Sequence, residues 1–112
     1  MTPHFSPYVE AGDLVFLSGA LAFGADGKIQ GDVAEQTRRV LAHLADVLND
    51  AGLALTDVVK TTVWITRAED FPSFNVAYAE VFGSSKPARS TVVTELAVPG
   101  ALVEIEAVAK RP

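Results

Sequence analysis

The sequence of 112 residues contains no cysteine. It therefore has no thiol that could form a disulfide, attack a substrate or bind zinc as a thiolate. Its two histidines, His4 and His43, belong to none of the His-x-His, His-x-x-x-His or His-Glu-x-x-His patterns typical of metal sites. Glycine-rich loops of the phosphate-binding type are missing as well. We expect neither a metal centre nor a bound nucleotide.

Long hydrophobic runs and clusters of positive charge are also absent. Apolar stretches such as Leu14–Leu17 are far shorter than the ~20 residues needed to cross a bilayer, and the N-terminus lacks the pattern of a secretory signal. Nine Lys and Arg residues against 14 Asp and Glu residues give a net charge of -5, and the basic residues are scattered. We therefore expect a soluble, cytoplasmic protein with no membrane and no nucleic acid partner.

What the sequence does contain is the composition of an ordinary globular protein. Hydrophobic residues make up 49% of the chain and charged residues 21%, which is enough to build one hydrophobic core and a charged, solvated surface around it. A chain of this length fits a single domain, so we expect residues 1–112 to form one unit.

The N-terminal third has the features of β-structure. Prolines make the opening His4–Tyr8 irregular, and the organised part of the chain is predicted to begin near Asp13. Two β-rich segments, Leu14–Ser18 and Leu21–Phe23, precede an Asp-Gly turn signal at Asp26. These segments predict strands in a hairpin or meander.

The pattern changes to a helical period after Gly31. Asp32 and Glu35 have the spacing of a capping box, and Gly52 is typical of a helix C-terminus. Apolar residues recur between them at spacings of three and four, namely Val33, Val40, Leu41, Leu44, Val47, Leu48 and Ala51. The spacing predicts an amphipathic helix over Val33–Ala51.

The second half of the chain predicts three strands and another helix. Val58–Thr66 is rich in β-branched residues, and Ser90–Leu96 and Leu102–Ala109 also have strand patterns. Between them, Asp70 is placed to cap a helix that ends at Gly83. That helix carries the stripe Phe71, Phe74, Tyr78, Val81 and Phe82. We interpret this stripe as core packing.

The predicted element order is ββαβαββ, which indicates an α+β fold with a mixed sheet. Two helices can cover only one face of such a sheet, so the other face should find a partner and the protein should form an oligomer. Alternation in the last strand places Val103, Ile105 and Ala107 on one face and Glu104 and Glu106 on the other.

Two charged residues remain as candidates for chemistry. Arg89 stands where a strand begins and offers a planar fork of donors suited to a carboxylate. Glu104, in the last strand, can orient or deprotonate a water. The same two residues can equally form a structural ion pair at the surface or at an interface. Ser18-Gly19 is not part of a Gly-x-Ser-x-Gly elbow and indicates a close approach of the backbone to another group.

Five segments, in this order and at compatible spacing, resemble the RidA (YjgF) family over almost the whole chain. They are Phe16-Leu17-Ser18-Gly19, the helix from Gln36-Thr37-Arg38 to Ala51-Gly52-Leu53, Asp57–Val63, Phe74–Tyr78, and the pair Pro87-Ala88-Arg89-Ser90 with Val103–Ala107. The resemblance implies a chorismate-mutase-like fold assembled as a homotrimer with ligand clefts between the subunits.

The resemblance also implies a cofactor-free deaminase that hydrolyses enamine and imine acids, such as 2-aminoacrylate and 2-iminopropanoate, to 2-keto acids and ammonia. By position, Arg89 would hold the substrate carboxylate, Glu104 would orient the attacking water, and Tyr8 would close the cleft. The residues that would line the cleft are Ser18, Gly19, Asn75 and Thr91.

The chain also departs from the family's pattern. Ala20 stands where the family often has glutamine, and Thr91 where it often has cysteine. The strings Ser18–Phe23 and Ala101–Ile105 are similar to members that hydrolyse 3-aminoacrylate in pyrimidine breakdown, which is an alternative substrate. A non-catalytic trimer that binds small carboxylates is a second alternative. The ribonuclease activity sometimes attributed to the family fits poorly with a net charge of -5.

Overall fold

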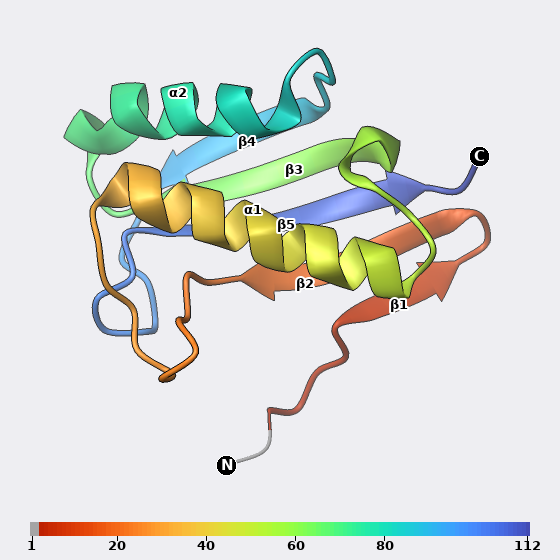
Figure 1. The fold of residues 1–112 in the computed structure, drawn as a ribbon, viewed down its shortest axis with the longest axis horizontal. Helices are drawn as coiled ribbons and strands as arrows, with labels where there is room; N and C mark the ends of the chain where they lie inside the picture. The colour runs from red at the N-terminus through yellow and green to blue at the C-terminus, as the bar shows by residue number, and fades with distance from the viewer. Residues whose placement is uncertain (1–2) are drawn as a thin grey trace.

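The computed structural model describes residues 3–112 and contains five strands and two α-helices in these residues (Figure 1). The strands are β1 (Tyr8–Ala11), β2 (Leu14–Ala20), β3 (Val58–Ile65), β4 (Ala88–Val93) and β5 (Val103–Lys110). The helices are α1 (Val33–Asp50) and α2 (Phe71–Phe82). The predicted order ββαβαββ is confirmed. The expected strand Leu14–Ser18 is β2, but its partner in the first pair is Tyr8–Ala11 and not Leu21–Phe23.

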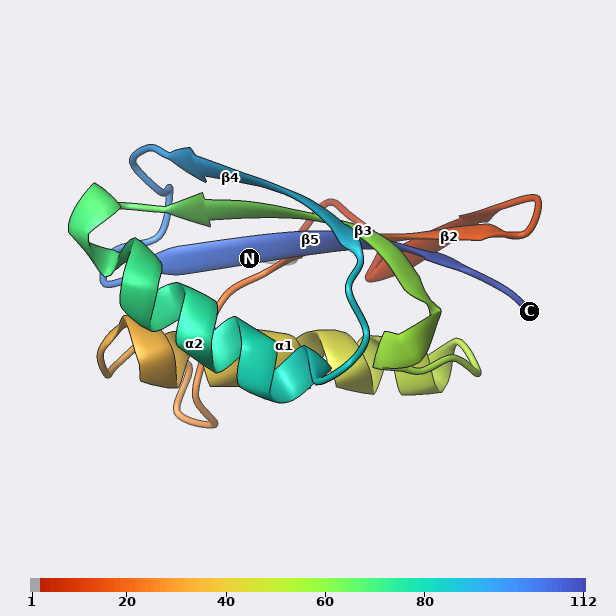
Figure 2. The ribbon, with the colours of Figure 1, turned by 90° about the horizontal axis from the view of Figure 1, so that it is seen from above.

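The five strands form one mixed sheet in the order β1-β2-β5-β3-β4. Neighbouring strands are antiparallel except β3 and β4, which are parallel and are joined through α2. Both helices lie against the same face of the sheet, and the opposite face is left open (Figure 2). The predicted α+β architecture with two helices on one face is therefore confirmed.

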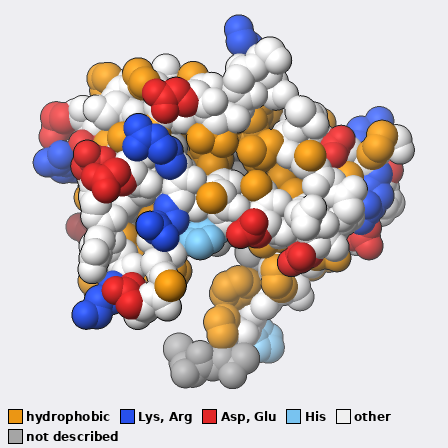
Figure 3. Space-filling view, in the orientation of Figure 1, with side chains coloured by type: hydrophobic (Ala, Val, Ile, Leu, Met, Phe, Trp, Pro, Cys, Tyr) orange, Lys and Arg blue, Asp and Glu red, His pale blue; other side chains and the backbone are white. Residues whose placement is uncertain are grey.

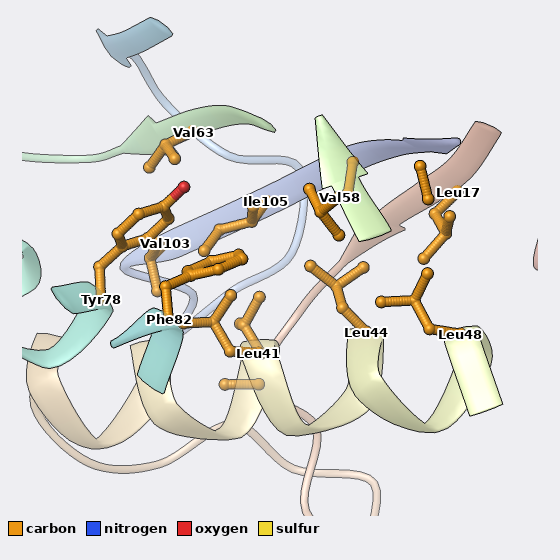
Figure 4. Packing of buried hydrophobic residues seen from close by; sticks show 14 of the residues in the cluster. Leu17, Leu41, Leu44, Leu48, Val58, Val63, Tyr78, Phe82, Val103 and Ile105 are labelled. Carbon is orange, nitrogen blue, oxygen red and sulfur yellow. The ribbon is translucent and has the colours of Figure 1, made fainter. Parts of the chain in front are cut away.

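The core lies between the helices and the covered face of the sheet. Leucines from α1 and aromatic rings from α2 point toward the inward residues of the strands, with Leu44, Phe82 and Ile105 among the contributors (Figure 4). Alternate residues of β5 are almost fully buried in this core, whereas Glu104 and Glu106 are not. The face assignment made from the alternation of β5 is confirmed.

Helix α1 begins and ends close to the predicted residues. The Asp32 side chain accepts a hydrogen bond from the Glu35 backbone N–H at 2.9 Å, and the reciprocal bond completes the capping box. Ala51 caps the C-terminus, and Gly52 adopts a φ of +77°, which favours glycine. Gln36, which is 2% exposed, ties the first turn of this helix to the loop before β5 by donating to the Gly100 carbonyl.

The first strand of the structure is Tyr8–Ala11, although the sequence predicts that the organised part of the chain begins only near Asp13. It pairs with β2 through a two-residue turn in which Gly12 has a φ of +63°, as a glycine-first hairpin turn requires. Pro7 lies immediately before this strand and therefore does not interrupt its hydrogen bonds. The predicted strand Leu21–Phe23 is wrong, because only Phe23 forms an isolated bridge, with Ile29.

Smaller differences concern the second half of the chain. Asp70 occupies the capping position of α2, but its carboxylate pairs with Arg67 at 2.8 Å and makes no capping bond. Strand β4 begins two residues earlier than predicted and ends at Val93, which stands opposite Ile65, the last residue of β3. In α2, Phe74, Tyr78 and Phe82 are buried as expected, but Phe71 is 39% exposed.

Candidate functional site

Arg89 lies near the start of the edge strand β4, on the helix-covered side of the sheet. Its register partner on β3 is Thr61, which is fully buried beneath α2. Paired residues of neighbouring strands project to the same face, so Arg89 also projects toward α2. The Cζ atom of its guanidinium lies 4.8 Å from the ring centroid of Tyr78, 5.4 Å from that of Phe74 and 5.7 Å from that of Phe71.

A cleft of about 380 Å³ opens beside Arg89, between α2 and the loop that leads into β4. Asn75, exposed on α2, lines the same cleft, as do Lys86 and Pro87. Thr91 follows on the same face of β4, level with the buried Val63 of β3. The structure therefore brings together two residues named from the sequence, Arg89 and Asn75, with Thr91 farther along the same strand face.

Glu104 lies on the open face of the sheet, in the middle strand β5. Its register partner on β3 is Trp64, the single tryptophan of the chain, and both line a cleft of about 240 Å³ with Glu95. Partial burial raises the pKa of the Glu104 carboxyl above its ordinary value, and the negative charge of Glu106 adds to this rise.

A bulge in β2 brings the backbone of Gly19 against Glu104. The register places Leu17 opposite Ala107 but Ala20 opposite Ile105, so two residues of β2 stand opposite one of β5. A Cβ atom built on Gly19 would lie 3.2 Å from Cδ of Glu104 and closer still to its Oε2. The predicted close approach at Ser18-Gly19 is confirmed.

Ser18 and Tyr8, the two other residues named from the sequence on β1 and β2, contact neighbouring residues of the same chain. The Ser18 hydroxyl donates to the carbonyl of Ser6 at 2.6 Å, which holds the segment before β1 against the bulge. Tyr8 stands opposite Leu17 and packs against the edge of the core. Tyr8 lines neither the cleft of Arg89 nor that of Glu104.

Arg89 and Glu104 lie on opposite faces of the sheet, so one chain does not bring them together. The ion pairs within residues 3–112 are Arg38–Glu80, Arg67–Asp70, Lys110–Asp13 and Arg111–Glu10. A structural Arg89–Glu104 ion pair within one chain is thereby excluded. Both charges remain available to a ligand or to a second chain.

The sequence did not indicate two features of these clefts. The aromatic stripe of α2 was interpreted as core alone, yet Phe71, Phe74 and Tyr78 also surround the Arg89 guanidinium. For Trp64 the sequence pattern predicts only a place in a strand. Its pairing with Glu104 follows from a strand register that no local pattern determines.

The described residues show neither a basic stripe on the helix-covered side nor a cluster of metal-ligating side chains. On the helix-covered side, Lys and Arg side chains are interspersed with Asp and Glu and do not form a continuous basic stripe (Figure 3). No group of three or more His, Asp and Glu side chains in this part of the chain is arranged to hold a metal ion. No helix of the described residues is long and apolar enough to span a membrane.

The fold and the positions of Arg89 and Glu104 define a small α+β protein with one candidate cleft beside α2 and another on the open face of a mixed sheet. The family model described as Endoribonuclease L-PSP matches residues 1–111. The chain belongs to this family, which includes the YjgF and RidA proteins.

Known relatives cover nearly the whole chain. The 3-aminoacrylate deaminase RutC of Acinetobacter baylyi is 38% identical over 112 residues, which is 96% of this chain and 89% of that protein. Protein mmf1 of Schizosaccharomyces pombe, named as mitochondrial, is 33% identical over 94% of this chain and 67% of that protein.

Solved structures agree with this assignment. The YjgF gene product of E. coli has a TM-score of 0.88 and 33% identity, covering 96% of this chain and 88% of that one. E. coli TdcF with bound serine has a TM-score of 0.90 and 32% identity, covering 100% of this chain and 91% of that one.

Proposed function

We propose that this protein is a cofactor-free hydrolase that converts reactive enamine and imine acids of the 2-aminoacrylate and 2-iminopropanoate type to 2-keto acids and ammonia. The similarity to a deaminase supports the reaction class. The serine bound to TdcF supports a small amino acid or keto acid as the kind of ligand. The observation that carries the proposal is that Arg89 and Glu104 both lack an ion-pair partner among residues 3–112 and face opposite sides of one sheet.

Opposite faces imply that the working site is shared between copies. Arg89 lies on an edge strand, where a second chain can approach it. The open face that carries Glu104 also exposes apolar side chains, with Phe16 44% and Val92 45% accessible. A chorismate-mutase-like homotrimer would cover these faces and place Arg89 of one copy beside Glu104 of the next.

The proposed reaction needs orientation and proton transfer more than it needs a strong nucleophile. Protonation of the enamine at its terminal carbon gives an imine whose C2 is electrophilic. Arg89 would hold the carboxylate through two parallel hydrogen bonds, which set its plane as well as its position. Glu104 would accept a proton from the water that attacks C2. Glu104 then passes this proton to the nitrogen of the carbinolamine. The C–N bond breaks as the hydroxyl gives its proton back to Glu104, and a 2-keto acid and ammonia leave.

The raised pKa of Glu104 suits this role. A carboxylate with a higher pKa is a stronger base, provided that the pH stays above that pKa. Burial, the main cause of the rise, would increase further when a second chain covers the open face. The acid limb of the rate is therefore expected at a higher pH than an ordinary glutamate would give.

The other residues named from the sequence take supporting roles in this proposal. Asn75 lines the Arg89 cleft directly. Gly19 and Ser18 would complete the Glu104 side, where the absence of a Cβ lets the carboxylate lie against the backbone. Thr91 and Tyr8 would line and close the shared cleft only after assembly. We expect the trimer to act in the cytoplasm, with no nucleic acid or membrane as partner.

The relative RutC favours 3-aminoacrylate as a second candidate substrate. Both acids are enamines with a carboxylate, but the nitrogen sits on C2 in one and on C3 in the other. With the carboxylate fixed at Arg89, the attacked carbon moves by about one bond length relative to Glu104, and such a displacement has a large effect on rate. The two substrates should therefore differ clearly in turnover.

A coupled assay tests the reaction. A dehydratase generates 2-aminoacrylate from serine in situ, and pyruvate release is followed with and without this protein. The uncatalysed hydrolysis supplies the baseline. We expect release to accelerate in proportion to protein concentration. Pyruvate that binds without any acceleration of hydrolysis would favour the carboxylate-binding alternative, and faster hydrolysis of 3-aminoacrylate would favour the second substrate.

A complementation experiment tests the shared site. Arg89→Ala and Glu104→Gln are each expected to be nearly inactive, but a copy with Glu104→Gln still offers Arg89 to a neighbour that retains Glu104. Mixing and reassembling equal amounts should restore about a quarter of all sites. Recovery of activity with a trimeric mass by light scattering supports the proposal. A monomer, or a mixture no more active than its components, contradicts the intersubunit site.

A further inference from the structure

Three aromatic rings of α2 surround the guanidinium of Arg89, and none of the ion pairs among residues 3–112 includes it. All three ring centroids lie within 6 Å of its Cζ atom, the range of cation–π contacts. Tyr78 lies nearest, at 4.8 Å. The positive charge of Arg89 is thus supported by neutral rings, which leaves that charge uncompensated for an incoming anion.

The ring of Tyr78 is itself held firmly. It is 7% exposed, and its centroid lies 4.6 Å from that of Phe82 and 5.4 Å from that of Phe74. The hydroxyl oxygen turns toward the sheet (Figure 4) and lies 2.7 Å from Oγ1 of Thr61. Burial raises the pKa of the Tyr78 hydroxyl, so the ring stays neutral beside the cation.

Thr61 connects this ring to the strand that carries the arginine. It stands directly opposite Arg89 in the parallel pairing of β3 with β4. In this pair, Arg89 is the cation and Thr61 anchors the ring of Tyr78 that lies beside it. A displacement of the Tyr78 ring would therefore change its contact with the Arg89 guanidinium directly.

We propose that Tyr78, anchored by Thr61, is a positioning residue that holds the Arg89 guanidinium by ring contact and leaves its N–H donors free to bind the substrate carboxylate. The inference rests on the proposed function, because it assigns Arg89 to the carboxylate. A carboxylate partner for Arg89 would occupy those donors, whereas an aromatic ring does not. The aromatic stripe of α2 is therefore both core and support for the site.

The test compares variants that keep or remove the ring. Tyr78→Phe keeps the ring and should raise KM by less than about 3-fold, whereas Tyr78→Leu removes it and should raise KM about 10-fold, with a smaller fall in kcat. Thr61→Val should resemble Tyr78→Phe. Leu48→Ala, a buried change on α1 far from Arg89 in the sequence and outside its cleft, controls for loss of stability alone. It should lower Tm without changing KM.

Two further readouts separate this inference from the reaction itself. The Nε–H signal of Arg89, assigned by its loss in Arg89→Lys, should show a ring-current shift in the parent that becomes smaller in Tyr78→Leu, where only the rings of Phe71 and Phe74 remain. Pyruvate affinity should fall in parallel with that signal. If the parent releases no keto acid, the proposed function fails, while the positioning role is still judged by the signal and by pyruvate affinity.

Three results would overturn the inference and leave the deaminase proposal standing. One is an unchanged Arg89 signal in Tyr78→Leu. Another is a reduced ring-current shift with KM and pyruvate affinity equal to those of the parent. A rise in KM for Leu48→Ala as large as for Tyr78→Leu would assign the effect to stability and would also contradict it.

Discussion

The two faces of the sheet support their charged residues by different means. On the covered face, side chains hold Arg89, with the rings of α2 around its guanidinium. On the open face, the backbone of Gly19 lies against Glu104, and a bulge in β2 brings it there. Substitutions near Arg89 should therefore act in proportion to the ring surface they remove. Near Glu104 even one added methyl group should disturb the carboxylate.

The largest effect is expected from removing the arginine. Arg89→Ala takes away an interaction made in both the ground state and the transition state, and it also takes away orientation. We expect kcat/KM to fall by about 10³-fold, with KM raised and kcat lowered. Initial rates over a range of substrate concentrations measure both. Arg39→Ala, a control substitution at an exposed position of α1, should have the kcat and KM of the parent. An Arg89→Ala variant with an unchanged KM would contradict the role of Arg89 in binding the substrate carboxylate.

Glu104→Gln should affect turnover without affecting binding. The amide keeps the size of the side chain but does not accept the proton from water, so kcat should fall by about 10²-fold while pyruvate affinity persists. Isothermal titration beside initial rates shows the split. Glu106→Gln on the same strand face is the matched control and should keep the parent's maximal kcat. Parent-like turnover in Glu104→Gln would make the carboxylate structural and would favour a binding protein.

Gly19→Ala tests whether the backbone positions the carboxylate. The new Cβ would overlap Oε2 of Glu104 and force it to move, so we expect kcat to fall about 10-fold with a smaller change in pyruvate affinity. Because both residues act through one group, adding Gly19→Ala to Glu104→Gln should cost little more than Glu104→Gln alone. Fully additive losses would show that Gly19 acts independently of Glu104.

The smallest expected effect concerns pH. The charge of Glu106 is the lesser cause of the raised pKa of Glu104, so Glu106→Gln should lower that pKa. The active, deprotonated form of Glu104 is lost as the pH falls through its pKa. The acid limb of kcat/KM should therefore move to lower pH in Glu106→Gln, and a pH profile of the two proteins measures the shift. A limb that stays in place would assign the titration to another group.

Local sequence signals account for much of the fold. The capping box at Asp32 and the apolar spacing that follows it specify α1 to within a residue, because capping and helical period act over a few neighbours. Alternation in β5 predicts which side chains are buried for the same reason. The short strand Tyr8–Ala11 escaped prediction because its stability comes from pairing with β2 rather than from its own residues.

By itself, the sequence determined both α-helices, four of the five strands and the family, and it named the candidate site residues. Alternation in β5 also separated Glu104 from the buried residues, but only the tertiary structure decided on which face Arg89 lies. The string Ala88–Val93 has no clear apolar alternation, so its orientation follows from parallel pairing with β3. The contact of Gly19 with Glu104 and the rings beside Arg89 arise in the same way, from strand register and helix packing between segments far apart in the chain. Such pairings depend on the whole sheet, and no local pattern specifies them.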